Sequence, residues 1–165
     1  MRRSAADLRI LGIDPGTTVT GYGVVEAGNG HLGRLVECGV IRTNPRDPLA
    51  KRLADLYDGV RALIARHHPG AVALESVFYG KNVRTTVSLG HARGVILLAA
   101  AQAELEVAEF APARVKKIVV GAGAATKPQV GYMVRKLLRL ERAPSPTDAA
   151  DGVAIALTYL LTRRP

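Results

Sequence analysis

The stretch 10–18 restricts the possible folds of this chain more than any other. Its first half is apolar and predicts a buried strand that ends at Asp14. Pro15 and Gly16 follow at once and favour a tight turn, because proline presets φ and glycine permits positive φ. In α/β proteins the carboxyl ends of strands carry the functional site. Asp14 is therefore either an ordinary turn residue or an acid held rigidly at a site, and other parts of the chain must distinguish the two.

The hydrophobic pattern elsewhere predicts an α/β fold. With 165 residues, the chain has the length of one domain, which we expect to cover residues 1–165. The first three strands form an antiparallel meander with a hairpin tip at 28–30, and each strand that follows a helix returns parallel. This order predicts a five-stranded mixed sheet, three antiparallel strands and then parallel ones, flanked by helices. Asp47 is the expected N-cap of the first helix, with Pro48 in its first turn. Strands are expected at 8–14, 21–26, 34–42, 71–74 and 105–110, and helices at 47–68, 82–104, 112–120, 127–140 and 147–161.

Positive charge is concentrated in one part of the sequence. The net charge is +9, and the segment 111–142 holds eight basic residues against one acid, Glu141. A concentrated basic surface suits a polyanion such as nucleic acid, although a generally basic surface needs no such partner. The single cysteine, Cys38, excludes an intrachain disulfide, and no apolar run is long enough to span a bilayer. Residues 1–7 lack the apolar core of a signal peptide, so we expect no membrane association and a cytoplasmic protein.

Two glycine-rich segments match nucleotide-binding motifs only in part. Residues 28–33 fit the pattern G-x-G-x-x-G, but they sit at a hairpin tip and lead into a strand, so no helix N-terminus can receive a pyrophosphate. Residues 121–127 resemble a phosphate loop, but Thr126 replaces the second glycine and Pro128 replaces the hydroxyl residue that would bind Mg²⁺. We therefore expect neither segment to bind a nucleotide.

Four carboxylates fall where the expected elements can bring them together. Asp14 and Glu75 each end a strand, and Asp148 and Asp151 lie three residues apart in the first turn of the last helix. Acids in a first helical turn are common for stability alone, but this helix is apolar nearly all round, so the pair is expected to be half-buried. No Arg or Lys accompanies these acids in their own motifs. A divalent ion such as Mg²⁺ or Mn²⁺ would relieve their repulsion, and two such ions beside a basic surface describe a metal-dependent nuclease.

Short motifs along the chain carry a resemblance to a known family. The chain resembles the RuvC family of Holliday-junction resolvases, and the match is collinear from residue 8 to residue 161. The resemblance implies a ribonuclease-H-like fold, a homodimer, and Mg²⁺ or Mn²⁺ as cofactor, with two ions per subunit. It also implies paired symmetric nicks in four-way DNA junctions during recombination and repair, together with the branch-migration proteins RuvA and RuvB. The motifs are GIDPG at 12–16, VTGYG at 19–23, LESVF at 74–78, KN at 81–82, LGHARG at 89–94, VK at 115–116 and DAAD at 148–151.

The resemblance assigns roles to individual residues. It makes Asp14, Glu75, Asp148 and Asp151 the catalytic acids that bind the metal. It makes Phe78 the aromatic side chain that stacks on bases at the crossover.

The expected DNA-binding set combines the resemblance with local composition. The resemblance places two lysines of the basic stretch near the scissile phosphates, and the segment after residue 78 mixes aromatic and basic side chains as single-strand binders do. Gly90 and Gly94 would allow another element to approach closely, and we expect their helix to form part of the dimer interface. The full set is Phe78, Tyr79, Lys81, Arg84, Arg93, Lys116, Lys117 and Lys127, of which Lys116 and Lys127 are the two near the scissile phosphates.

Three other functions are compatible with parts of this sequence. Actin-like and heat-shock ATPases share a similar acidic glycine loop, but they close two domains around a nucleotide, and 165 residues cannot supply both. A non-catalytic junction-binding module would not need four acids. A YqgF-like nuclease acting on RNA is the nearest alternative, and Phe78 together with the extended match favours DNA.

Overall fold

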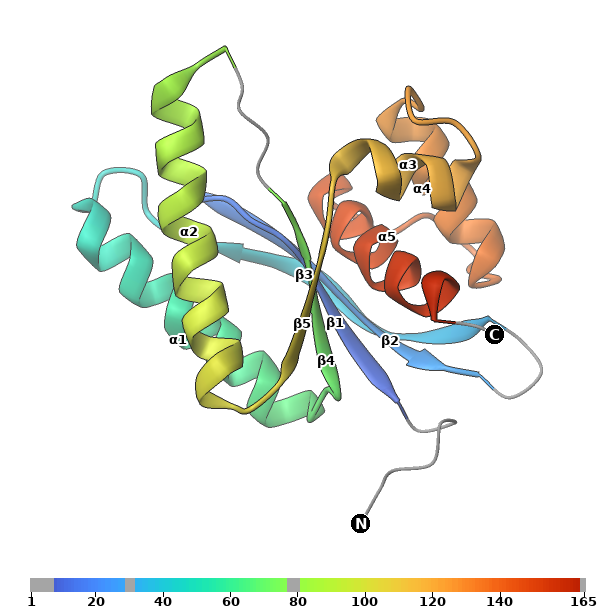
Figure 1. Cartoon of the computed structure of the whole chain (residues 1–165), viewed down its shortest axis with the longest axis horizontal. Helices are drawn as coiled ribbons and strands as arrows, with labels where there is room; N and C mark the ends of the chain where they lie inside the picture. Colours follow the sequence, from blue (N-terminus) through green and yellow to red (C-terminus); the bar gives the residue numbers. More distant parts are fainter. Residues whose placement is uncertain (1–7, 29–31, 77–80, 164–165) are drawn as a thin grey trace.

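The computed structural model describes residues 8–28, 32–76 and 81–163, and within them the strands form one mixed sheet (Figure 1). The strands are β1 Arg9–Asp14, β2 Val19–Ala27, β3 Gly33–Arg42, β4 Ala71–Glu75 and β5 Glu106–Phe110. Their order is β3-β2-β1-β4-β5. β1, β2 and β3 pair antiparallel, whereas β4 pairs parallel with β1 and β5 pairs parallel with β4. The predicted α/β class and the ribonuclease-H-like sheet are confirmed.

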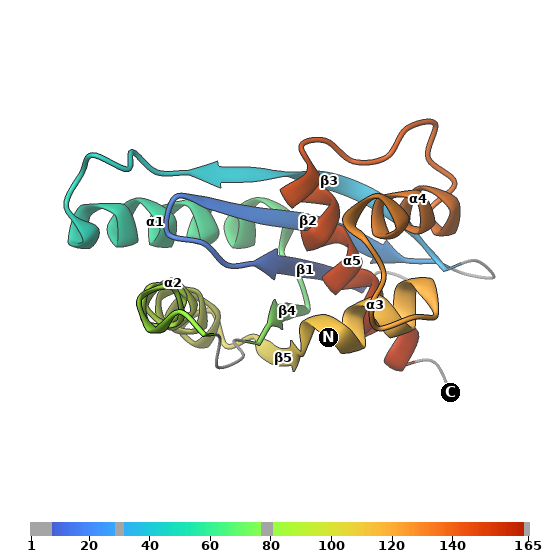
Figure 2. The same ribbon diagram turned by 90° about the horizontal axis from the view of Figure 1, so that it is seen from above.

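Helices cover both faces of this sheet. One layer holds α1 (Leu49–His67) and α2 (Val83–Gln102), and the other holds α3 (Pro112–Val120), α4 (Lys127–Leu137) and α5 (Thr147–Thr162) (Figure 2). The central strand β1 is buried on both faces, because Leu11 and Ile13 pack in the α1–α2 core whereas Ile10 packs in the α5 core. In the described part of the chain, no helix is long and apolar enough to cross a membrane.

Two helix ends differ from the sequence-based expectation. The prediction of Asp47 as N-cap is wrong, because the backbone stays extended through Pro48, which is the N-cap, and the carboxylate of Asp47 lies 3.8 Å from the ammonium of Lys51. α4 ends at Leu137 rather than at 140, because Arg139 adopts a left-handed φ of 53° and the chain turns there. The other described elements end within two residues of the predicted bounds, while residues 29 and 30 of the expected hairpin tip lie outside the described residues.

Helix α5 lies directly against the backbone of β1 and β2. A Cβ atom on Gly12 would lie 2.2 Å from the carbonyl oxygen of Gly152, and one on Gly21 would lie 1.9 Å from that of Asp148. Ordinary contacts of a Cβ atom are 3.4–4 Å, so only glycine permits this approach. Asp14 and Gly21 are register partners across β1 and β2. The contact at Gly21 therefore brings the start of α5 beside the end of β1.

Candidate metal and nucleic-acid site

The four predicted acids meet at one end of the sheet. Asp14 ends β1, Glu75 ends the neighbouring parallel strand β4, and Asp148 and Asp151 lie in the first turns of α5. One carboxylate oxygen from each of Asp14, Asp148 and Asp151 lies within 4.8 Å of the others. The carboxyl group of Glu75 shares a hydrogen bond with that of Asp14. The structure thus brings together side chains that are more than 130 residues apart in sequence.

Burial makes ionisation of these acids unfavourable. Burial, and then the nearby charge of Glu75, raises the pKa of Asp14 from 3.8 to about 9. Burial also raises the pKa of Glu75, and it raises the pKa of Asp151 in spite of the lysine beside it. A hydrogen bond between two carboxyl groups requires a proton on one of them. A divalent cation would replace that proton and neutralise the cluster, so the donor set fits a metal ion that prefers oxygen ligands.

Lys127 pairs with two of the acids. Its ammonium lies 3.1 Å from Oδ2 of Asp151 and 3.9 Å from Oδ1 of Asp148, and the hydrogen bond to Asp151 is the main cause that raises the lysine pKa. A capping box between Thr126 and Gln129 fixes the start of α4 and therefore the position of Lys127. The lysine side chain is 61% exposed, so it can also turn towards a ligand in solvent.

Lys116 and Arg93 approach the acids from other elements. Lys116, on α3, lines a small cavity together with Glu75 and Asp151. Arg93, on α2, has a side chain only 16% exposed, donates from Nε to the backbone carbonyl of Glu75 at 3.3 Å and forms an ion pair with Glu109. Arg93 therefore holds the strand end that carries Glu75, and its guanidinium is committed to protein groups.

The other members of the expected DNA-binding set are exposed or lie outside the described residues. Lys81 and Arg84 are exposed at the start of α2, and Lys117 is exposed on α3. Phe78 and Tyr79 lie outside the described residues.

One cation that holds the loop after Asp14 was missed in the sequence. Arg52, on α1, donates hydrogen bonds to the hydroxyl oxygen of Thr17 and to that of Thr18, in the loop that follows Asp14. In the sequence, Arg52 is one polar residue in an amphipathic helix, and no local signal separates it from a solvated helix face.

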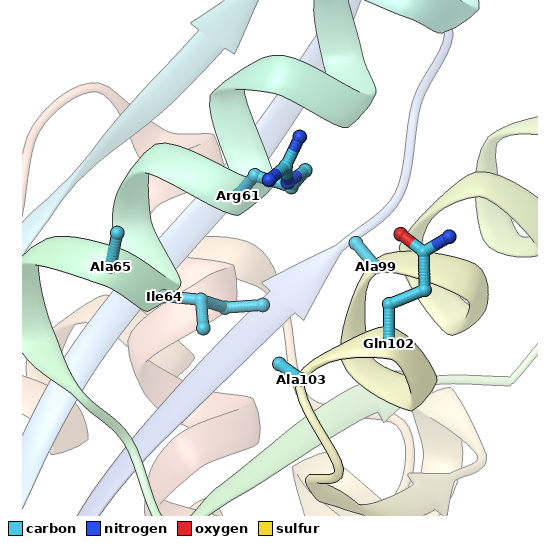
Figure 3. A pocket seen from close by; sticks show the side chains of 6 residues that line it. All are labelled: Arg61, Ile64, Ala65, Ala99, Gln102 and Ala103. Carbon is cyan, nitrogen blue, oxygen red and sulfur yellow. The ribbon is translucent and has the colours of Figure 1, made fainter.

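A separate cavity of about 210 Å³ lies between α1 and α2 (Figure 3). The guanidinium of Arg61 lies 5.6 Å from the centre of the Tyr57 ring, whose hydroxyl group bonds to Gln102 at the cavity rim. None of the acids lines this cavity, so its chemistry is separate from theirs. It is lined by Arg61, Ile64, Ala65, Ala99, Gln102 and Ala103.

Comparison with known proteins identifies the family. Residues 10–159 match the family model described as crossover junction endodeoxyribonuclease RuvC. The RuvC of Halorhodospira halophila is 54% identical over 151 residues, which cover 92% of this chain and 89% of that protein. The RuvC of Pelotomaculum thermopropionicum is 50% identical over 151 residues and 91% of each chain.

Solved structures agree with the sequence comparison. Thermus thermophilus RuvC in complex with a Holliday junction substrate superposes with a TM-score of 0.89 and 36% identity over 95% of each chain. The yeast mitochondrial Holliday junction resolvase shares the fold, with a TM-score of 0.67 and 15% identity over 93% of this chain and 79% of that one. From the family model and these relatives, we conclude that the chain belongs to the RuvC family of crossover junction endodeoxyribonucleases.

Proposed function

We propose that this chain resolves four-way DNA junctions by paired symmetric nicks, in which water attacks a phosphodiester bond. The observation that carries the proposal is the cluster of four acids, flanked by Lys116 and Lys127, in a chain of the RuvC family. A basic surface of this kind holds a polyanion beside an acidic metal site. The Thermus thermophilus relative, which was solved with a Holliday junction, supports the choice of substrate.

We propose that Asp14, Glu75, Asp148 and Asp151 hold Mg²⁺ or Mn²⁺, with two ions per subunit. The carboxylate oxygens of Asp14, Asp148 and Asp151 lie within 4.8 Å of one another and can share ions, and oxygen ligands suit both metals. When bound, such ions supply an activated water molecule and stabilise the charge that develops on the leaving oxygen.

The lysines neutralise the phosphate and orient it. The ammonium of Lys127 is exposed and donates to the carboxylate of Asp151. A scissile phosphate can replace that carboxylate as the acceptor without a large movement of α4. Lys116 approaches the same acids from α3. Phe78, Tyr79, Lys81, Arg84 and Lys117 are proposed to contact the junction further out.

A twofold-symmetric junction calls for two active sites, so we propose a homodimer. Helix α2 supports this assembly. Val83, Val87 and Leu98 are 74%, 53% and 51% exposed, and Gly90 and Gly94 have nothing within 4 Å of a built Cβ atom. These five residues follow helical spacing and form one apolar stripe that a second copy of α2 could cover.

The remaining expectations rest on membership of the family. We propose that residues 1–165 act as a single catalytic domain, that RuvA and RuvB are its partners, and that it works in the cytoplasm.

Cleavage of a labelled mobile four-way junction tests the proposal directly. Linear duplex, single strand and an RNA junction serve as competing substrates, each with Mg²⁺, Mn²⁺ or chelator. We expect paired nicks that need metal and disappear in Asp14→Asn, while junction binding persists. Asp58→Asn, an exposed acid on α1, is the control and should cleave normally. Tight binding without cleavage in either metal would instead support the binding module, and preferred cleavage of RNA would support the YqgF-like alternative.

A further inference from the structure

Arg52 is a half-buried cation fixed against the loop that follows Asp14. Its Nε donates to the backbone carbonyl of Thr17 at 3.2 Å, and its Nη2 donates to the hydroxyl oxygens of Thr17 at 2.9 Å and of Thr18 at 2.8 Å. A guanidinium has five N–H groups on three nitrogens, so these bonds fix its plane. Nη1 donates to no described residue, which leaves its two N–H groups available.

The charge of Arg52 has no acidic counterpart among the described residues, because all of its acceptors are neutral oxygens. Other partly buried arginines are paired: Arg9 lies 2.8 Å from Glu26, and Arg93 forms an ion pair with Glu109. Burying an unpaired charge is costly, and a rigid guanidinium with free N–H groups is a typical phosphate ligand. An anion would supply the pairing that Arg52 lacks.

Hydroxyl groups complete the site around this cation. Thr18 is exposed and its oxygen accepts from Arg52, so its own O–H group can donate to a ligand. Behind it, the hydroxyl of Thr17 bonds to that of Ser88 on α2 at 3.1 Å. The hydroxyl of Thr43, just after β3, donates to the Thr17 carbonyl, so the loop is fixed by residues from three parts of the chain. The free donors therefore have a rigid support.

The site follows Asp14 in the chain and lies in the helix layer opposite that of Lys127. Thr18 is four residues beyond Asp14, which limits their separation to about 14 Å. One DNA strand carries a phosphate about every 3.4 Å along the helix axis, so this distance corresponds to at most about four nucleotides. Arg52 belongs to the α1–α2 layer, whereas Lys127 belongs to the α3–α5 layer (Figure 2). Cations thus flank the acids from both faces of the sheet.

We infer that Arg52 and Thr18 bind a phosphate of the cleaved DNA strand, within about four nucleotides of the scissile phosphate. The identity of the ligand rests on the proposed function. The inferred contact adds a second anchor for the strand, so that it is held on both sides of the acids.

Binding measurements across a salt series test this contact without any cleavage step. A labelled four-way junction is titrated in chelator with the wild type, Arg52→Gln and the control Arg61→Gln, which removes an exposed arginine from the same helix. We expect Arg52→Gln to weaken binding about tenfold and to lower the slope of log Kd against log salt by about 0.9 per subunit. The control should change neither quantity.

A neutral methylphosphonate linkage, moved one nucleotide at a time along the cleaved strand, then locates the phosphate. We expect wild-type binding to weaken at one linkage within about four nucleotides of the cut, and Arg52→Gln to be insensitive at that linkage. Equal sensitivity of both proteins at every linkage, or an unchanged salt slope, would overturn the inference and leave Arg52 as a clamp on the loop.

Two further measurements cover the cases in which Arg52→Gln does not fold or the wild type does not cleave. If Arg52→Gln fails to fold, Thr18→Val removes the hydroxyl that donates to the ligand and accepts from Arg52. A wild type that tolerates every neutral linkage outside the scissile one then overturns the inference. A wild type that binds the junction but does not cleave it would count against the proposed function, while the binding data would still test the phosphate contact.

Discussion

The substitution Gly21→Ala should separate catalysis from DNA binding. The added Cβ atom would lie 1.9 Å from the carbonyl oxygen of Asp148, whereas ordinary contact begins at 3.4 Å. The two backbones must therefore separate by about 1.5 Å, because a carbonyl inside a helix cannot rotate away. Since Gly21 is the register partner of Asp14, the separation opens directly between two acids of the cluster.

Two magnitudes follow from this displacement. Overpacking of a rigid contact costs about 1–3 kcal/mol of unfolding free energy, which for a chain of this size is a fall in Tm of about 2–12 °C. A misplacement of about 1 Å at a reacting centre costs about 10²-fold in rate. We expect single-turnover cleavage to fall about 100-fold, because the acids of the proposed metal site no longer lie in the same geometry. Junction affinity should change less than about twofold, because the cations proposed to contact phosphate do not depend on the position of α5 alone.

The assay compares Gly21→Ala with Gly131→Ala, whose added Cβ atom would meet only the Cβ of Ala143, at 3.8 Å. Cleavage rate, junction Kd and Tm with and without Mg²⁺ are measured for both proteins and the wild type. The control should match the wild type in all of them. Wild-type cleavage by Gly21→Ala, at an unchanged Tm, would refute the idea that this glycine sets the distance between the acids.

Further predictions concern metal, positioning and assembly. Because the pKa of Asp14 is raised to about 9, the folded protein holds a proton that the unfolded chain releases near pH 4. Without metal, the free energy of unfolding should therefore fall as pH rises towards 9. Mg²⁺ competes with that proton, so the increase in Tm that Mg²⁺ gives in calorimetry should grow over the same pH range. A constant gain from pH 5 to 9 would contradict this linkage. Arg93→Gln should slow cleavage about tenfold with unchanged junction affinity, since it holds the backbone of Glu75; weaker binding with normal cleavage at saturation would make it a DNA ligand instead. If the proposed dimer forms through α2, Leu98→Glu should give monomers in light scattering and uncoupled nicks. Leu49→Glu, at an exposed position on α1, should leave the oligomeric state of the wild type unchanged.

Local sequence patterns are sufficient for the elements and for the acids. The apolar run and the turn residues that end β1 are adjacent, and the rule that parallel strands share an edge places Asp14 near Glu75. The acids of α5 stand out because a carboxylate is unusual in a helix that is otherwise buried. The helix ends at Pro48 and Arg139 were missed, because they depend on single backbone torsions that many residues can adopt.

The cations of the site are harder to predict than its acids. Arg52 reaches Thr17 across 35 residues, and Lys127 reaches Asp151 across 24 residues, so neither contact has a local signature. Each lies on an amphipathic helix whose pattern reports only the face turned to the core. Arg93 shows a contact of the same kind, because its position near an aromatic segment predicts a DNA ligand and gives no sign of the hydrogen bond to the Glu75 carbonyl or the ion pair with Glu109.

The glycines explain how acids from a sheet and a helix can share one site. Hydrogen-bonded strands lie about 4.8 Å apart, which is close enough for the carboxylates of Asp14 and Glu75 to meet. When a helix packs through its side chains, its axis stays about 10 Å from the neighbouring backbone. At that distance the short side chain of Asp148 could not reach the end of β1. Because Gly21 has no side chain, the helix backbone can touch the strand, which closes that gap. The GIDPG and VTGYG segments therefore combine two tasks, because one supplies the acid and the other supplies the bare backbone on which its partner helix rests.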